Sequence, residues 1–155
     1  MAIWFANPTI DEARASHMGL LASHLGIEFL EFGPDYLRGC MPVEPRVHQP
    51  MGYLHGGASL VLAETLGSVA ANYVVDGTRQ RCMGQEINAN HLRPVSDGIV
   101  TGVARPFHLG TRSQVWSIEI RDPRERLVCV SRLTMAVIDW RPQRDKDGEE
   151  QKTWK

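Results

Sequence analysis

Glu64 is an acidic residue within an almost wholly apolar stretch, and it follows a histidine and two glycines. A carboxylate can attack a carbonyl carbon or draw a proton from water. The glycines of His55-Gly56-Gly57 let the backbone come close to a ligand, and the first free N–H groups of a helix can stabilise a developing oxyanion. With Gln49 in the preceding loop, these residues predict one site that polarises a carbonyl group and supplies a base or a nucleophile.

A helix expected at residues 58–75 would carry Glu64. Leucine, valine and alanine leave this segment little polar face, so we expect protein to surround it on most sides and Glu64 to be a buried acid. At about 1.5 Å per residue, the helix would span roughly 27 Å. Ser68 follows Glu64 by four residues, so it lies on the same face and could hydrogen-bond the acid or a water molecule.

The remaining pattern predicts one hairpin before this helix and four strands after it. The hairpin is expected at 26–32 and 36–43, and the strands at 81–92, 98–107, 113–122 and 127–139. Thr9 and Glu12 form a capping box at the head of a short first helix, and a second helical turn at 20–25 should end at Gly26. This order predicts an α+β fold, with an antiparallel sheet wrapped on the long helix, and not a doubly wound fold.

Length and composition predict one cytoplasmic domain. The 155 residues suffice for a single core, expected at 1–140, whereas 141–155 are charged and expected to form a disordered tail. A net charge of −1 with mixed signs argues against a nucleic-acid or membrane partner. Cys40, Cys82 and Cys129 are far apart, which indicates reduced thiols. The sequence has no secretory signal pattern and no stretch apolar enough to cross a bilayer.

Other hydrolytic and cofactor-binding motifs do not fit this sequence. Ser59 is not in the Gly-x-Ser-x-Gly turn of a serine hydrolase. The glycines after His55 lack the Lys-Ser/Thr of a phosphate-binding loop. No His or Cys pair has metal-site spacing, so no metal is expected. His17, His24 and His48 are interpreted as ordinary surface, half-buried or loop residues.

Six separated motifs occur in an order that resembles a known family. They are Met41-Pro42-Val43, Gln49-Pro50, Leu54-His55-Gly56-Gly57-Ala58-Ser59, Leu62-Ala63-Glu64-Thr65-Leu66-Gly67-Ser68, Glu86-Ile87-Asn88-Ala89-Asn90-His91 and His108-Leu109-Gly110. Together they resemble the hotdog-fold acyl-CoA thioesterases of the phenylacetate-pathway type. Within that family the sequence is most similar to the 1,4-dihydroxy-2-naphthoyl-CoA and enterobactin-associated proofreading thioesterases. The similarity covers roughly residues 25–139.

This resemblance implies a hotdog fold, in which a curved antiparallel sheet wraps around one long central helix. Dimers of the family join two sheets edge to edge and commonly pair into tetramers, so a homodimer or homotetramer is expected. By the same resemblance, Gln49, His55 and Gly56 flank the thioester carbonyl, and Glu64 reaches them from the other subunit. Ser68 matches a supporting residue of the family.

The resemblance also implies a path for the acyl group and coenzyme A. Val69 would line the acyl pocket. Candidates for the pantetheine path and the phosphates are Gly84, His91, Arg93, His108, Gly110 and Arg112. Arg112 could bind a phosphate through two parallel hydrogen bonds. Because coenzyme A is part of the substrate, no separate cofactor is expected.

These features predict an acyl-CoA thioesterase that hydrolyses an aromatic or medium-sized acyl-CoA to the free acid and CoA, with Gly56 as the oxyanion donor. The sequence leaves open whether Glu64 is the general base or the nucleophile, and whether CoA or an acyl-carrier protein carries the acyl group. Two other functions stay open: a hotdog-fold hydratase or dehydratase, and a non-catalytic acyl-CoA-binding module. Release of free thiol separates hydrolysis from dehydration.

Overall fold

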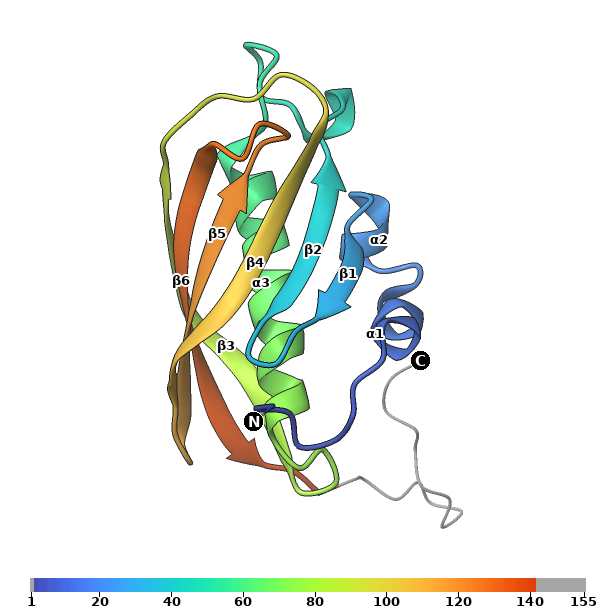
Figure 1. Cartoon of the computed structure of the whole chain (residues 1–155), viewed down its shortest axis with the longest axis vertical. Coiled ribbons are helices and arrows are strands. Elements are labelled where there is room, and N and C mark those ends of the chain that lie inside the picture. Colours follow the sequence, from blue (N-terminus) through green and yellow to red (C-terminus); the bar gives the residue numbers. More distant parts are fainter. Residues whose placement is uncertain (1, 142–155) are drawn as a thin grey trace.

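The computed structural model describes residues 2–141, which form a curved antiparallel sheet around one long helix (Figure 1). The helix is α3 (Gly56–Val74); two shorter helices, α1 (Ile10–His17) and α2 (Leu21–His24), precede the sheet. The strands are β1 (Glu28–Phe32), β2 (Leu37–Pro42), β3 (Gln80–His91), β4 (Ile99–Leu109), β5 (Ser113–Arg121) and β6 (Leu127–Asp139). Their order across the sheet is β1-β2-β4-β5-β6-β3. The predicted α+β arrangement is confirmed, and each of the expected strands is found within about two residues of its expected bounds.

Local sequence explains where α3 begins and ends. His55 has extended backbone angles, and its side chain accepts a hydrogen bond from the Gly57 N–H, so the helix begins at Gly56 rather than at residue 58. Beyond Val74, Asp76 accepts a hydrogen bond from the Thr78 N–H at 3.0 Å and turns the chain toward β3.

α3 packs closely against the concave face of the sheet. Leu62 and Leu66 are fully buried in the same cluster as Trp116. Gly39 and Gly102 lie opposite each other on β2 and β4, and a Cβ added to them would lie only 2.6 and 2.8 Å from the Leu66 methyl carbons. The two glycines therefore leave room for Leu66, which allows the helix to lie close to the sheet.

β3 follows α3 in the sequence but lies at the edge of the sheet, where it pairs only with β6. Residues 83–86 of this strand are exposed, and so is Glu64 on the neighbouring face of α3. The expectation of a buried Glu64 is therefore wrong for a single chain. The physical reason is that, within residues 2–141, no further strand extends the sheet beyond β3, so this part of the helix has no cover on that side.

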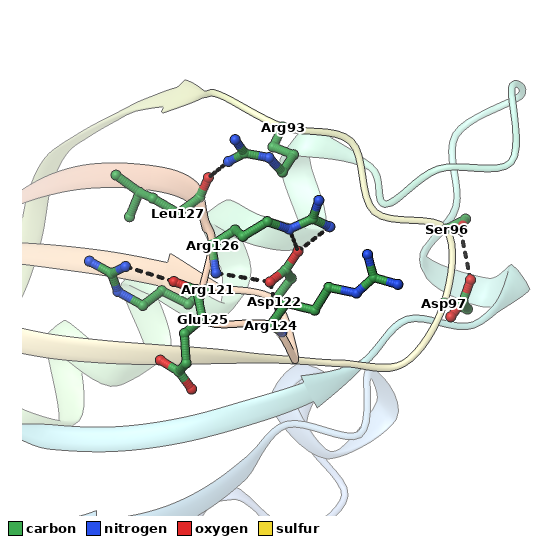
Figure 2. A network of polar contacts seen from close by, with 9 residues as sticks. All are labelled: Arg93, Ser96, Asp97, Arg121, Asp122, Arg124, Glu125, Arg126 and Leu127. Atoms are coloured by element: carbon green, nitrogen blue, oxygen red, sulfur yellow. Dashed lines mark hydrogen bonds and ion pairs between the residues drawn. The ribbon is translucent and has the colours of Figure 1, made fainter.

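The turn between β5 and β6 is held by a buried carboxylate (Figure 2). Asp122 accepts hydrogen bonds from the N–H groups of Arg124 and Arg126 and from the Arg126 guanidinium. Burial alone would raise the pKa of Asp122, but these hydrogen bonds and the charge of Arg126 outweigh it and lower the pKa. The loop after β3 is tied to the same turn, because Arg93 donates to the Leu127 carbonyl at 2.8 Å.

Two smaller features of the amino-terminal region also agree with the predictions from the sequence. Thr9 and Glu12 form the predicted capping box of α1. Gly26 follows the short second helix with a φ of 71°, the left-handed conformation that was expected there.

The remaining expectations concern cysteines, metals, membranes and the tail. Cys40, Cys82 and Cys129 are free thiols. Within residues 2–141 no group of three His, Cys, Asp or Glu side chains could hold a metal ion. No helix in the described part of the chain has both the length and the apolar character needed to cross a membrane. Apart from Arg141, the tail expected at 141–155 lies outside the described residues.

Candidate active site

The start of α3 presents a free backbone donor. His55 Nδ1 accepts a hydrogen bond from the Gly57 N–H at 2.8 Å, and the next two N–H groups along the helix donate to the His55 carbonyl. The Gly56 N–H has no hydrogen-bond acceptor among residues 2–141. This donor and the positive end of the helix dipole are available to a ligand. An oxygen that gains negative charge would be stabilised at this point.

His91, at the end of β3, closes one side of this position. A Cβ added to Gly56 would lie 2.6 Å from His91 Nε2, which is too short for a normal contact. The backbone of Gly56 is not in the left-handed region, so the constraint at this position is the His91 ring, which would have to shift to admit a larger side chain. His91 itself is exposed in the single chain.

Gln49 lies in the tight loop that leads to His55. Gly52 closes this loop with a φ of 79°, and its N–H donates to the Gln49 carbonyl at 2.9 Å. The side-chain oxygen of Gln49 accepts a hydrogen bond from the Met51 N–H. The fold therefore holds Gln49 and His55 in one loop, with the Gln49 side-chain oxygen engaged within that loop.

Glu64 lies two helical turns from Gly56, about 12 Å along the axis. Its Oε1 lies 2.9 Å from the position that a Cβ on Gly84 would take, so the carboxylate rests over this glycine of β3. Within one chain, Glu64 does not meet His55 and Gly56. The prediction that these residues form one site is thus not met by a single copy.

The predicted coenzyme A residues lie at two opposite ends of the sheet. Gly84 pairs with Met135, Met135 with Gln114, and Gln114 with Leu109, so the loop carrying Gly110 and Arg112 lies at the Gly84 end. At the other end, Arg93 donates to the carbonyl of Leu127, where β6 begins. Gly84 and His91 are seven residues apart on β3, so about 23 Å separates the two ends, at roughly 3.3 Å per residue.

The predicted residues therefore fall into two groups. The helix-start group contains Gln49, His55, Gly56, His91 and Arg93. The Glu64 group contains Glu64, Ser68, Val69, Gly84, His108, Gly110 and Arg112. Members of each group share one end of the sheet, and no residue of one group contacts the other group's reactive atoms within the chain.

Ser68 and Val69 line a cavity of about 270 Å³ between α1, α3 and β3. The other lining residues are Ser16, His17, Asn72, Tyr73 and Arg81. Ser68 is one helical turn beyond Glu64, about 6 Å along the axis, so the cavity begins close to the Glu64 carboxylate. Val69, which the family resemblance assigns to an acyl pocket, is one of its lining residues.

The cavity residues of α1 and β3 were not predicted from the sequence. His17 was expected to be an ordinary half-buried or surface residue, and no role was predicted for Arg81. Local sequence carries no signal for either, because α1, α3 and β3 come together only through long-range packing.

Known proteins that are similar to this chain in sequence and structure include several thioesterases. A family model described as the thioesterase superfamily matches residues 51–129. The 1,4-dihydroxy-2-naphthoyl-CoA hydrolase of Escherichia coli is 48% identical over 136 residues, covering 88% of this chain and 99% of the relative. The proofreading thioesterase EntH of Cronobacter turicensis is 49% identical and covers 88% and 98%, respectively. The structure of a mutant of thioesterase PA1618 from Pseudomonas aeruginosa has a TM-score of 0.88, with 44% identity over 90% of this chain and 100% of that one.

Proposed function

The chain belongs to the thioesterase superfamily and is a thioester hydrolase with the hotdog fold, and we propose that it hydrolyses acyl-CoA thioesters at a site completed by a second copy. The observation that carries this proposal is the separation of Glu64 from Gly56 along α3. Both residues lie beside β3, whose outer edge is not paired with another strand. A homodimer, alone or as half of a tetramer, would unite the two groups.

The free edge of β3 has a defined length. At Cys82, the backbone N–H and carbonyl on this edge are bonded to the Asn72 side chain at 2.9 and 3.1 Å. The part open to another strand therefore runs from about Gly84 to His91. An exposed edge of this kind is a template for pairing with another strand.

A symmetric dimer would pair this edge with itself, with the two strands antiparallel. If the pairing is centred near Ile87 or Asn88, Gly84 of one copy lies opposite His91 of the other. Since Glu64 rests over Gly84 and Gly56 lies beside His91, each carboxylate would then approach the free N–H of the other copy. The open part of the edge, from about Gly84 to His91, thus supports the same pairing that would bring Glu64 to the Gly56 N–H of the other copy.

In this dimer, the thioester carbonyl oxygen accepts a hydrogen bond from the Gly56 N–H of one copy. Glu64 of the other copy acts by one of two routes. As a general base, it takes a proton from water, whose oxygen attacks the acyl carbon; the C–S bond breaks and CoA leaves as a thiolate, which then takes up a proton. As a nucleophile, it forms an anhydride with loss of CoA, and water hydrolyses that anhydride. Single turnover in ¹⁸O-labelled water distinguishes them, because only the anhydride route can transfer label to Glu64.

The substrate class is proposed as an aromatic or medium-sized acyl-CoA. The cavity beside Ser68 supports this size, because about 270 Å³ is slightly less than the volume of pockets for drug-sized ligands and suits an acyl group alone. An acyl-carrier protein thioester would be an alternative donor of the same acyl group. The free thiols support action in the cytoplasm, where cysteines stay reduced.

Mixing two inactive variants tests the shared site. Glu64→Ala and Gly56→Ala chains, each expected to lose about 10²-fold or more in activity alone, would be unfolded and refolded together, and free thiol would be measured with a thiol reagent. Half of the dimers would be hybrids with one intact site of two, so about a quarter of the wild-type activity should return. A site contained in one chain would show no recovery, which would overturn the shared-site proposal.

A further inference from the structure

Apolar and polar side chains from three elements line the cavity beside Ser68. Val69 and Tyr73 belong to α3, whereas His17 and Arg81 come from α1 and β3. Arg81 lies three residues before Gly84 on β3, so it is roughly 10 Å from the strand position beside the Glu64 carboxylate. An acyl group that enters the cavity with its carbonyl near Glu64 would therefore bring its other end within reach of these polar residues.

Arg81 brings a positive charge that no carboxylate neutralises within residues 2–141. Its guanidinium donates to the carbonyls of Gly77 and Gln80 and lies 5.4 Å from the centre of the Trp140 ring. These contacts hold the side chain beside the cavity and leave other guanidinium donors unused, since Arg has five N–H donors. A half-buried cation of this kind favours an oxygen acceptor.

His17 adds a second polar group. Its Nδ1 lies 2.9 Å from both the Ala13 carbonyl and the Ser16 hydroxyl. The Ser16 hydroxyl itself donates to the Ala13 carbonyl, which can only accept, so a proton on Nδ1 satisfies these contacts and leaves Nε2 free. The ring is also held by an edge contact with Phe29, with the ring centres 5.1 Å apart. Burial raises the pKa of the Tyr73 phenol, with the charge of Glu12 adding to the effect, so this hydroxyl stays protonated as a donor.

We propose that Arg81 and His17 determine acyl specificity by binding an oxygen substituent at the far end of an aromatic acyl group. Arg81 donates to that oxygen, which belongs to a hydroxyl or a carboxylate, and His17 accepts from a hydroxyl. This inference rests on the proposed function, because it concerns the acyl part of the same site.

Matched CoA esters test the proposal with the full-length enzyme. The 4-hydroxybenzoyl ester is compared with 4-methylbenzoyl, and the 4-carboxybenzoyl ester with 4-isopropylbenzoyl, as ratios of kcat/KM. We expect at least one oxygen-bearing ester to be preferred by about tenfold or more, the effect of one hydrogen bond to a charged group. The pair that shows the preference tells whether the oxygen is a hydroxyl or a carboxylate.

Arg81→Met should bring that ratio close to one, and His17→Phe should lower it. Arg79→Met is the matched control, because Arg79 is exposed and does not line this cavity, and it should keep the wild-type ratio. A wild-type ratio near one for both pairs, or a ratio that Arg81→Met leaves unchanged, would overturn the proposal. If no ester released thiol, the proposed hydrolysis would fail, and calorimetric binding of the same pairs to Glu64→Gln and Glu64→Gln/Arg81→Met would still decide this inference.

Discussion

The oxyanion donor of the helix-start group and the carboxylate of the Glu64 group lie on the same helix, yet different forces position them. At the start of α3, the His55 cap and two glycines prepare a backbone N–H, and all of this is encoded within a few residues. In the middle of the helix, Glu64 is placed by the packing of α3 on the sheet and by the glycine at Gly84. Local sequence builds the Gly56 donor of the first group, whereas long-range packing sets the surroundings of Glu64 in the second.

Neither group is chemically complete by itself. A helix dipole end can stabilise an oxyanion but cannot take a proton, and a carboxylate can take a proton but cannot stabilise an oxyanion. About 12 Å of helix separates the two functions in one chain. An edge strand that runs past both of them offers a way to join the groups from two chains.

The largest effect is expected from removing the charge of the Glu64 group. Glu64→Gln should lower kcat by about 10² to 10⁴, the usual contribution of a general base. Thiol release measures the rate, circular dichroism verifies the fold, and Glu28→Gln on the exposed face of β1 serves as the matched control. A folded Glu64→Gln enzyme with more than about a tenth of wild-type turnover would contradict the role of this group.

A smaller loss is expected from disturbing the helix-start group. The methyl of Gly56→Ala would overlap His91 Nε2, so the ring, the helix start or both must shift. Misplacement of about 1 Å can cost up to about 10²-fold, and we expect a loss of kcat/KM of this order with a nearly unchanged melting temperature. Wild-type kinetics in this variant would show that the space beside Gly56 is not used.

A charge on the free edge of β3 should dissociate the dimer. This would separate the helix-start group of one copy from the Glu64 group of the other without changing a residue of either group. Asn88→Lys would bring two lysines together at the centre of the proposed pairing, and like charges across strands are destabilising. Light scattering should then show dissociation at enzyme concentrations where wild type stays dimeric, with loss of activity on dilution. Leu30→Lys, on β1 at the opposite edge, is the control, and equal dissociation in both variants would argue against pairing through β3.

The smallest effect is expected at the turn that anchors the helix-start end of the sheet. Glu125 has a φ of 60°, a conformation that costs a side-chain-bearing residue about 1 kcal/mol more than glycine. Glu125→Gly should therefore raise the free energy of unfolding by up to about 1 kcal/mol, with part of the gain offset by the greater entropy of glycine in the unfolded chain. Urea denaturation measures the change, and lower stability in the variant would mean that the Glu125 side chain contributes more than its backbone strain costs.

Much of the fold followed from short-range patterns. Apolar periodicity, turn residues and the capping box located the helices and strands, and the separated motifs pointed to the correct family. The error lay in the surroundings of Glu64. An apolar helix predicts burial on all sides, but whether a given face is covered depends on strand order, and β3 follows α3 in sequence while lying at the sheet edge.

Taken alone, the sequence determined the chemistry that is available: a capped helix start with a free N–H, a carboxylate two turns later, and strands to hold the helix. These are local properties, set by hydrogen bonds and side chains close together in the chain. The tertiary structure decided which of these groups can meet. It put Gly84 beside Glu64, His91 beside Gly56, and His17 and Arg81 at one cavity, because such neighbours arise only from packing between distant segments.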